Sequence, residues 1–428
     1  MAMCVEDRIS NFSDHVLCHI LSFLPIKEAV RTSIISTKWR NLFVSISIIK
    51  FDGDLLFGLT DRNIDSFKNF VDGLLKFPDQ VSLDCFRLHD GISSWNDGDH
   101  DFDVSGWICA ALCRGVKEID LKLQDVPPVL FTCHSLVNLT LDAVGSKIEV
   151  PSDVCLGNLK TFYLINSVFV SDSINRLISN CHVLEDLAFI ECSIANASEL
   201  NIQSSSLKEL ALLYFDPTDI DHVVVINAPN LVYFQYDCDI VVCLLSNMKS
   251  LEKAEVYIWF FSDYYEIQDY SDYETSAAHL IQGICNVRSL TLGFPKEIFP
   301  TSRLPIFYNF NELEFREDIC SVEFLHCVPN LKKLILKYLN YAGTQWKGLC
   351  IEIPSCLSFH LKEIEIEIPC IDTHMIEMVS YLLDNAMVLE RLIIISTNRL
   401  TTTTEKRKVR NQLLQLLKSS KKCLIVIL

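Results

Sequence analysis

The chain has 428 residues, of which half are hydrophobic, and its formal net charge is −18. That length predicts roughly two to four domains with a large hydrophobic core, while the negative charge argues against nucleic acid or an anionic membrane as the main partner. The first residues, MAMCVEDRIS, lack the apolar segment of a signal peptide, and no apolar run approaches the ~18 residues of a membrane span, so we expect a soluble intracellular protein.

The first predicted element is a helix over residues 14–24, because apolar residues recur there at helical spacing. Ser13 can cap its start, and Pro25 ends it. The recurring apolar residues are Val16, Leu17, Ile20, Leu21, Phe23 and Leu24.

Two further short helices are predicted after this proline. The residues of the second that should face inward are Ala29, Val30 and Ile34. Ser36 can cap the third, whose apolar residues are Trp39, Leu42 and Phe43. Three short helices in about 40 residues bury little apolar surface on their own, so we expect that surface to need a partner.

A repeated pattern begins near residue 83: an apolar residue, two variable residues, an apolar residue, one variable residue and an apolar residue. From Leu136 to Leu251 the first apolar positions lie 20 to 25 residues apart, which is the period of a leucine-rich repeat. Clear copies occupy residues 135–141, 158–164, 183–189, 206–212, 230–236, 250–256, 286–292, 330–336, 360–366 and 388–394, and weaker ones 83–88, 116–121 and 310–315.

Each copy is predicted to be a strand, because its last apolar residues alternate with period two. The 20-odd residues between copies suit a return to a parallel neighbour by helix or irregular coil. One such helix is predicted over residues 171–182, with Ser171 as its N-cap and Ile174, Leu177 and Ile178 on one face. Neighbouring repeats must stack into a solenoid with a curved parallel sheet, since none can bury its apolar face alone.

Residues between the repeat leucines are expected on the open, concave face of that sheet. In the central repeats many are apolar: Tyr163, Ile165, Ala188, Ile190, Ala211, Leu213, Tyr233 and Tyr257. Towards the C-terminus they become charged: Glu312, Glu314, Arg316, Lys333, Glu363, Glu365 and Glu367. The apolar stripe is either covered by a neighbouring segment or is a partner groove, and the two interpretations have equal weight.

Two acidic inserts interrupt the repeats, at residues 89–103 and 261–274. Such inserts are most often solvated loops. The second also contains clustered tyrosines, among them Tyr264 and Tyr265, and is the better candidate for binding. We therefore predict that a basic segment of a partner docks near this insert, since acidic loops speed the encounter with a basic partner.

Sequence signals for chemistry are weak. His15 and His19 have metal-ligand spacing on a helix, but no further ligand lies near them, so exposed histidines are the preferred interpretation. The 18 cysteines include no C-x-x-C motif and are expected to be buried free thiols, with Cys109 and Cys113 packing inside. No nucleotide-binding or hydrolase motif occurs, so we predict no catalytic residue, metal or cofactor.

The segment DRISNFSDHVLCHILSFLPIKEAVRTSIISTKWRNLF (7–43) resembles the F-box of the plant F-box/FBD/LRR-repeat family. The shared residues include the DRIS start, the ILSFLP core and Lys38-Trp39-Arg40. Residues 107–123 are similar to the first repeats of that family. From about Trp346 the chain resembles its FBD region, through IPSCLSFHLKEIEIEI, MVSYLLDNAMVLERLII and KSSKKCLIVIL.

This resemblance implies an α/β protein with a three-helix F-box (1–50), a leucine-rich-repeat solenoid (51–345) and an FBD region that continues and closes it (346–428). It also implies the role of a substrate-recognition adaptor in an SCF (Skp–cullin–F-box) ubiquitin ligase, located in the nucleus or cytoplasm. The F-box would bind a Skp adaptor, and through it the cullin and RING subunits, while the repeats hold a protein substrate.

The residues expected to bind the Skp adaptor are Phe12, Ser13, Val16, Leu17, Ile20, Leu21, Leu24, Pro25, Val30, Ile34 and Trp39. Those expected to bind substrate are Tyr163, Ile190, Leu213, Tyr233, Tyr257, Tyr264 and Tyr265. The family usually has Leu-Pro where this chain has Phe12-Ser13, and Ser lacks the fixed φ of proline. The alternative is therefore a leucine-rich-repeat scaffold, outside any ligase, whose F-box has drifted.

Overall fold

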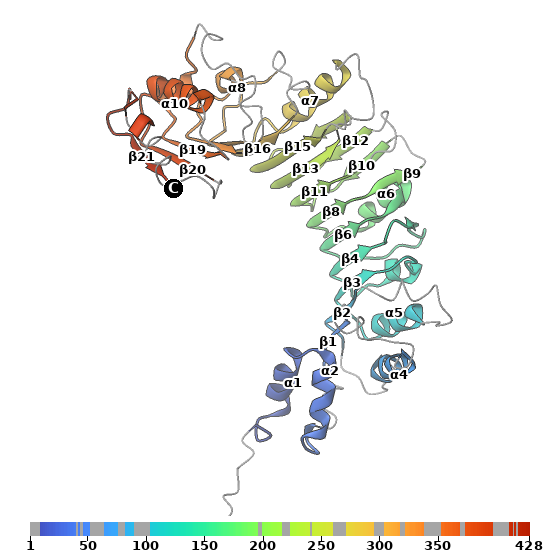
Figure 1. Cartoon of the computed structure of the whole chain (residues 1–428). Coiled ribbons are helices and arrows are strands. Elements are labelled where there is room, and N and C mark those ends of the chain that lie inside the picture. Colours follow the sequence, from blue (N-terminus) through green and yellow to red (C-terminus); the bar gives the residue numbers. More distant parts are fainter. Residues whose placement is uncertain are drawn as a thin grey trace, which may run out of the picture. The chain divides into compact units, whose positions relative to one another are not determined.

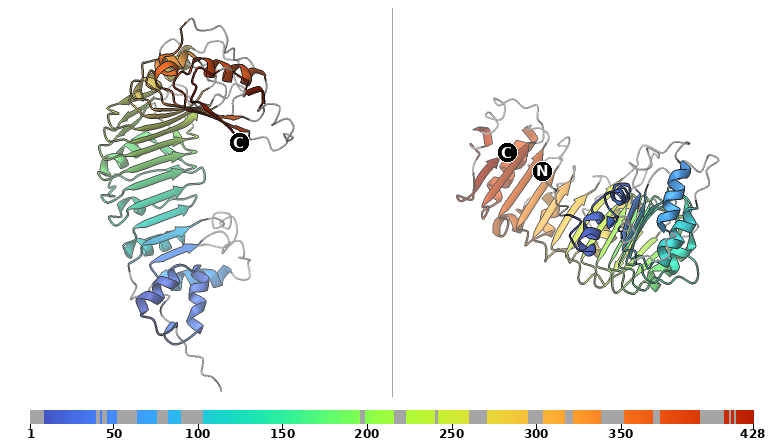
Figure 2. Two further views of the ribbon diagram at one scale, coloured as in Figure 1. Left: turned by 90° about the vertical axis from the view of Figure 1, so that its left-hand side faces the viewer. Right: turned by 90° about the horizontal axis from the view of Figure 1, so that it is seen from below.

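The computed structural model describes residues 9–39, 42, 46–51, 64–75, 82–89, 103–195, 199–215, 223–239, 242–259, 271–294, 304–316, 322–337, 352–368, 373–396, 411–413, 415–416 and 418–428. The chain forms two compact units, Met1–Ala195 and Asn196–Leu428. Each unit is α/β and is built on strands that run parallel and side by side (Figures 1 and 2).

The first unit begins with the predicted helices. They are α1 (Asp14–Ser22), α2 (Ile26–Arg31) and the 3-10 helix η1 (Thr32–Ile34). Ser13 precedes α1 with an extended backbone, but its side chain makes no capping hydrogen bond. The first helix was predicted to run to residue 24 but ends at Ser22, and Pro25 is the N-cap of α2. The third predicted helix lies only partly within the described residues, where Trp39 and Leu42 are buried.

The main sheet of the first unit has the order β1-β2-β3-β4-β6-β8. Its strands are β1 (Ile48–Phe51), β2 (Cys85–Leu88), β3 (Glu118–Lys122), β4 (Asn138–Asp142), β6 (Thr161–Ile165) and β8 (Asp186–Ile190). Its return segments include α4 (Ile64–Leu75), α5 (Val104–Cys113), the 3-10 helix η3 (Pro128–Thr132) and α6 (Ser171–Asn180). Figure 1 shows α5 and α6 on the same side of this sheet.

The prediction for α6 is confirmed on its buried face, which contains Ile174, Leu177 and Ile178. Its N-cap is Val170 rather than Ser171, because the helix already includes Ser171, which is itself buried. The prediction that Cys109 and Cys113 pack inside is wrong, since both are exposed on α5. This helix turns Trp107, Ile108 and Ala111 towards the core, and the two cysteines lie on the other side.

The main sheet of the second unit has the order β11-β13-β15-β16-β17-β18-β19-β20-β21. Its strands are β11 (Glu209–Leu213), β13 (Tyr233–Asp239), β15 (Lys253–Trp259), β16 (Ser289–Gly293), β17 (Glu312–Arg316), β18 (Lys333–Lys337), β19 (Glu363–Ile368), β20 (Arg391–Ser396) and β21 (Leu424–Ile427). Its helices are α7 (Ser271–Gly283), α8 (Val322–Cys327), α9 (Ser355–Phe359) and α10 (Thr373–Asn385). In Figure 1 α8 and α10 cover one face of this sheet.

Every strand predicted from the repeat pattern is present, and alternate residues of each are buried, as in Leu139 and Leu141 of β4. The face that carries the intervening residues is called the open face of each unit below. The sequence pattern did not predict two smaller parallel sheets within the return segments. They are β5 (Lys147–Ile148), β7 (Val168–Val170) and β9 (Ser193–Ala195) in the first unit, and β10 (Glu199–Gln203), β12 (Val223–Asn227) and β14 (Val242–Ser246) in the second.

An asparagine before the repeat leucine ties successive repeats together. The side-chain amide of Asn158 donates to the carbonyl of His134 at 2.7 Å, Asn230 donates to Ser205 at 2.7 Å, and Asn330 donates to Tyr308 at 2.9 Å. Each bond satisfies a carbonyl of the preceding turn that no strand partner reaches. At these three places successive repeats are therefore tied together at the start of the strand as well as along it.

Strand β21 closes the sheet at the end of the region expected to cap the solenoid, and its side chains are only partly covered. It pairs in parallel with β20, and Cys423 just before it is buried, whereas Leu424 is 62% exposed. Its contribution is thus mainly backbone pairing along the edge of β20.

Deleting residues 423–428 is expected to lower both solubility and the melting temperature, because it exposes the edge of β20 and removes the buried Cys423. Thermal unfolding of the truncated and full chains, followed by circular dichroism, measures the effect. Leu428→Ser is the matched control, since that side chain is 64% exposed and should hardly change the melting temperature. Equal melting of the truncated and full chains would contradict a capping role.

Candidate partner-binding surfaces

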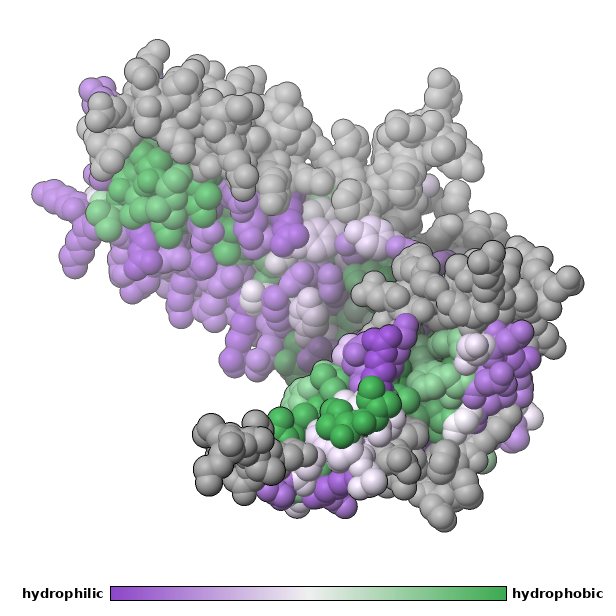
Figure 3. All heavy atoms as spheres, turned by 60° about the horizontal axis from the view of Figure 1, so that its bottom comes forward, coloured by the Kyte–Doolittle hydropathy of each residue, from purple (hydrophilic) through white to green (hydrophobic). Residues whose placement is uncertain are grey.

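Helix α1 and the residues at its two ends present an exposed apolar row. Phe12, Val16, Ile20 and Leu24 recur every four residues and are 50%, 39%, 38% and 39% exposed. Residues at this spacing share one face of a helix. Figure 3 shows hydrophobic side chains gathered over these N-terminal helices. This row, called the α1 row below, is the surface that the sequence predicted to need a partner.

The structure divides the residues predicted to bind an adaptor into surface and core. Leu17 and Leu21 are fully buried, and Trp39 is 4% exposed. The indole nitrogen of Trp39 donates to the hydroxyl of Ser10 at 2.9 Å, which fixes the segment before α1. These three residues form the core between the helices and support the α1 row, and their direct contact with an adaptor stays a prediction.

The remaining predicted residues are accessible. Ser13 and Pro25 are exposed, and Val30 is half-buried. Ile34 was predicted to face inward, and that prediction is wrong, since its side chain is 87% exposed. Ile34 belongs to the 3-10 helix η1, which follows α2 directly and has no buried residue. The helical spacing that buries Ala29 in α2 therefore does not apply to Ile34.

Sequence reasoning missed three further apolar side chains of this surface, namely Ile9, Phe23 and Ile35, which are all more than half exposed. The ring of Phe23 packs edge-on against His19 with centroids 4.9 Å apart. The signal that could have found them is the presence of apolar residues on more than one side of each short helix, which is more than so small a unit can bury.

The open faces carry the residues predicted to bind substrate. In the first unit, the Tyr163 hydroxyl donates to the Asp186 carboxylate on the adjacent strand, and Ile190 is half-exposed. In the second unit, the strand register places Leu213 opposite Asp237, and Asp237 opposite Tyr257. Tyr233 lies at the start of β13, four residues before Asp237 and therefore on the same face of the strand. Tyr264 and Tyr265 lie outside the described residues.

Burial governs the chemistry of these tyrosines. Burial raises the pKa of Tyr233 to about 12, and neighbouring Glu255 adds to the effect. Burial also raises the pKa of Tyr257. Both hydroxyls can donate hydrogen bonds at physiological pH, as an ordinary tyrosine does, and the raised pKa values extend this to more alkaline conditions. Within the described part of the chain the Tyr257 hydroxyl has no hydrogen-bond partner, whereas Tyr233 donates to Gln235 at 3.2 Å.

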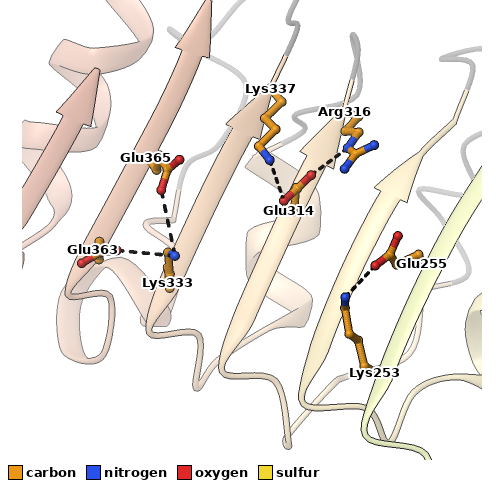
Figure 4. A network of polar contacts seen from close by, with 8 residues as sticks. All are labelled: Lys253, Glu255, Glu314, Arg316, Lys333, Lys337, Glu363 and Glu365. Carbon is orange, nitrogen blue, oxygen red and sulfur yellow. Dashed lines mark hydrogen bonds and ion pairs between the residues drawn. The ribbon is translucent and has the colours of Figure 1, made fainter. Parts of the chain in front are cut away.

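Strands β15, β17, β18 and β19 place a network of ion pairs on the open face of the second unit (Figure 4). Glu314 lies between two cations, 2.7 Å from the Arg316 Nε and 3.3 Å from the Lys337 Nζ. Lys333 lies between Glu363 and Glu365 at 3.6 and 3.9 Å. The predicted change from apolar to charged residues is confirmed. Within this network each acid therefore lies beside a base, and the eight side chains drawn carry no net charge together.

Gly293 gives Tyr257 its position on this face. The guanidinium of Arg316 lies 5.0 Å from the centre of the Tyr257 ring, within the range of a cation–π contact. Gly293 is the register partner of both Tyr257 and Arg316. A Cβ atom at Gly293 would come within 2.7 Å of the Tyr257 ring, so only glycine leaves the ring room to lie across this strand.

Gly293→Ala is expected to lower the free energy of unfolding by about 1–3 kcal/mol, because the ring must move and the surrounding strands resist it. Gly73→Ala is the matched control: nothing lies within 4 Å of its added Cβ in helix α4, so we expect stabilisation by about 0.5–1 kcal/mol. Urea unfolding of both variants measures the two effects. A Gly293→Ala protein as stable as the unmodified chain would show that the Tyr257 ring is not held by this contact.

The acidic, tyrosine-rich insert falls mostly outside the described residues. Its last residues, from Ser271 onward, start helix α7 and are not part of a loop, which corrects the predicted extent of the insert. Helix α7 packs closely against β14, where a Cβ at Gly283 would meet the Leu245 side chain at 2.5 Å. Docking of a basic segment near the insert stays a prediction.

The described residues contain no group of three or more metal-ligating side chains and no helix long and apolar enough to cross a membrane. His15 and His19 are both exposed, as the preferred interpretation expected. The described cysteines are free; the buried ones are Cys85, Cys181, Cys192, Cys238, Cys243, Cys356 and Cys423.

Comparison with known proteins finds three domain families along the chain. The F-box domain family matches residues 9–51. The family described as "FBD-associated F-box protein At5g56370, LRR repeats" matches residues 104–244, and the FBD family matches residues 351–394. The F-box match contains the α1 row, the repeat match contains strands β3 to β13, and the FBD match contains strand β19 and most of β20.

Three similar proteins from Arabidopsis thaliana cover most of the chain. F-box/FBD/LRR-repeat protein At5g22660 is 30% identical over 414 residues, which is 90% of this chain and 89% of the relative. F-box/LRR-repeat protein 13 is 32% identical with the same coverage. F-box/FBD/LRR-repeat protein At5g22700 is 29% identical over 413 residues, or 90% and 92% of the two chains.

Proposed function

This chain belongs to the F-box/FBD/LRR-repeat family, and from that membership we propose that it is a substrate adaptor of an SCF ubiquitin ligase. The α1 row binds a Skp adaptor, which links the chain to cullin and RING subunits. The repeats hold a protein substrate. The chain itself then makes and breaks no bond: its contribution is to keep the substrate close to the ubiquitin-loaded enzyme.

The observation that carries this proposal is the exposed α1 row together with Ile34. These apolar side chains are too many for a small helical unit to leave in water without a partner, and they sit on a rigid support of buried Leu17, Leu21 and Trp39. The Phe12-Ser13 pair is compatible with the role. Phe12 supplies apolar surface, and Ser13 has φ −66°, close to the value that proline would impose.

Co-expression of the full chain with a plant Skp adaptor tests the proposal. We expect a stable one-to-one complex by size-exclusion chromatography with light scattering. A folded chain that forms no such complex would instead support the alternative, a leucine-rich-repeat scaffold with a drifted F-box. A fluorescent fusion would test the accompanying proposal that the protein acts in the nucleus or cytoplasm.

We also propose that the substrate carries a basic segment that docks near residues 261–274. The support is the acidity of this segment and the tyrosines of the neighbouring strands. Once a substrate is identified, its association rate is measured with Asp263, Glu266, Asp269, Asp272 and Glu274 neutralised. An association rate and salt dependence equal to those of the unmodified chain would place recognition elsewhere.

A further inference from the structure

Strand β21 has a free outer edge within the described part of the chain. It is the terminal strand of its sheet, and it pairs with β20 only. The backbone N–H groups of Leu424 and Leu428 donate to Glu390 and Ile394 of β20 at 3.0 and 2.9 Å. In a parallel ladder every second residue bonds to a given neighbour. The N–H and C=O groups of Ile425 and Ile427 therefore point outward, away from β20.

An apolar surface lies beside this edge. The register pairs Ile393 of β20 with Val426, and residues two apart along a strand share a face. Leu424, Val426 and Leu428 thus lie on the open face together with Ile393 and Ile395. Leu424 and Leu428 are 62% and 64% exposed, and the other three are half-buried. Figure 3 shows this hydrophobic patch over the C-terminal strands.

The edge is flanked by positive charge, although the whole chain is acidic. Residues 411–428 include Lys418, Lys421 and Lys422 and no acidic residue. Lys418 is held at the start of the strand, where its ammonium donates to the carbonyl of Cys423 at 3.2 Å. Lys421 and Lys422 are exposed. Two acids of the adjoining repeats are paired, since Glu390 lies 2.9 Å from Lys362 and Glu363 lies 3.5 Å from Arg391, while Glu367 is the register partner of Ile395 at the far side of the patch from β21.

We propose that β21 binds an extended, acidic segment of another protein, which adds to its outer edge as a further strand. The outward groups of Ile425 and Ile427 supply the backbone hydrogen bonds, as in other cases of strand addition. The apolar patch receives alternate side chains of the segment, and the lysines attract its acidic residues. A second copy of this chain offers the same lysines and no acid at this edge, so charge favours a different partner. The site is independent of adaptor binding by the α1 row.

The test uses the full chain and a fluorescent seven-residue peptide in which valine and glutamate alternate. We expect it to bind, and we expect a peptide with lysine in place of glutamate to bind at least about tenfold more weakly. Ile425→Pro removes one outward N–H and leaves the bonds of Leu424 and Leu428 to β20 intact, so it should also weaken binding by about tenfold or more. The melting temperature checks that this variant remains folded.

The charge requirement is tested with Lys421→Glu combined with Lys422→Glu. This variant should lose binding of the acidic peptide, whereas the matched control, Lys249→Glu with Lys332→Glu, changes two exposed lysines away from β21 and should keep it. Equal binding of the two peptides, or full binding by Ile425→Pro, overturns the proposal. So does light scattering that finds a dimer which Ile425→Pro dissociates, because a second copy would then occupy the edge.

Discussion

Replacing Val16 and Ile20 together with Asp is expected to reduce affinity for a Skp adaptor by at least about 100-fold. Val16 and Ile20 are 39% and 38% exposed, so burying the rest of each side chain contributes roughly 0.6–1.2 kcal/mol, and every 1.4 kcal/mol corresponds to about a factor of ten in affinity. Each new carboxylate must also lose water on binding. Because both side chains are already partly exposed, the fold should tolerate the change. Titration calorimetry with the purified adaptor measures the loss.

The matched control is Leu21→Ala, one residue from Ile20 but fully buried. We expect it to lower the free energy of unfolding by about 2–5 kcal/mol. Binding should fall only in proportion to the fraction of the protein whose helices are unfolded. At a temperature where this variant stays folded, its affinity should approach that of the unmodified chain. If the double Asp variant binds normally, the α1 row is not the docking surface.

Trp107→Ala should cause the largest loss of stability in the first unit, about 3–5 kcal/mol. Trp107 is fully buried, its indole N–H donates to Asp72 of α4 at 2.8 Å, and its ring meets Phe67 edge-on at 6.2 Å. Its removal leaves a cavity between α4 and α5 and breaks a hydrogen bond that joins them. Chemical unfolding followed by circular dichroism measures the midpoint.

Cys109→Ala serves as its control, because Cys109 lies on the exposed side of the same helix and its loss should change stability by less than about 0.5 kcal/mol. Trp107→Phe should fall between the two, since it keeps most of the volume and loses the donor to Asp72. A Trp107→Ala protein that unfolds at the midpoint of the control would mean that α4 and α5 do not depend on each other.

The main strands were predictable because two apolar residues at period two, repeated every 20 to 25 residues, leave few other arrangements. The smaller sheets were not. Lys147 and Ile148 of β5 form too short a run for any period to appear, and their pairing with β7 is imposed by the stacking of the main strands. The turns gave no signal either: Val144, Glu191 and Tyr214 adopt left-handed φ without the glycine that usually marks it.

The candidate site was predictable in composition but not in its division between core and surface. Helix α1 carries apolar residues as neighbouring pairs, Val16 with Leu17 and Ile20 with Leu21. Helical spacing puts such a pair on one broad apolar side and does not tell which member a second helix covers. That choice depends on where α2 and Trp39 pack, which is tertiary information. Residues such as Ile34, just beyond the end of α2, were misplaced for the same reason.

Because the main strands pair residue for residue, the fold should tolerate insertions and deletions of some lengths and not of others. Leu207 and Leu231 occupy equivalent positions 24 residues apart, each just before a strand whose buried residues alternate with open-face residues. Loss or duplication of the whole segment between them joins matching ends and keeps every side chain on its own face. A one-residue insertion within a strand moves the following buried side chains to the open face and the following open-face side chains into the core. Length differences among relatives should therefore collect in whole repeats or in the return segments, and the recognition surface can be recombined repeat by repeat without redesigning the core.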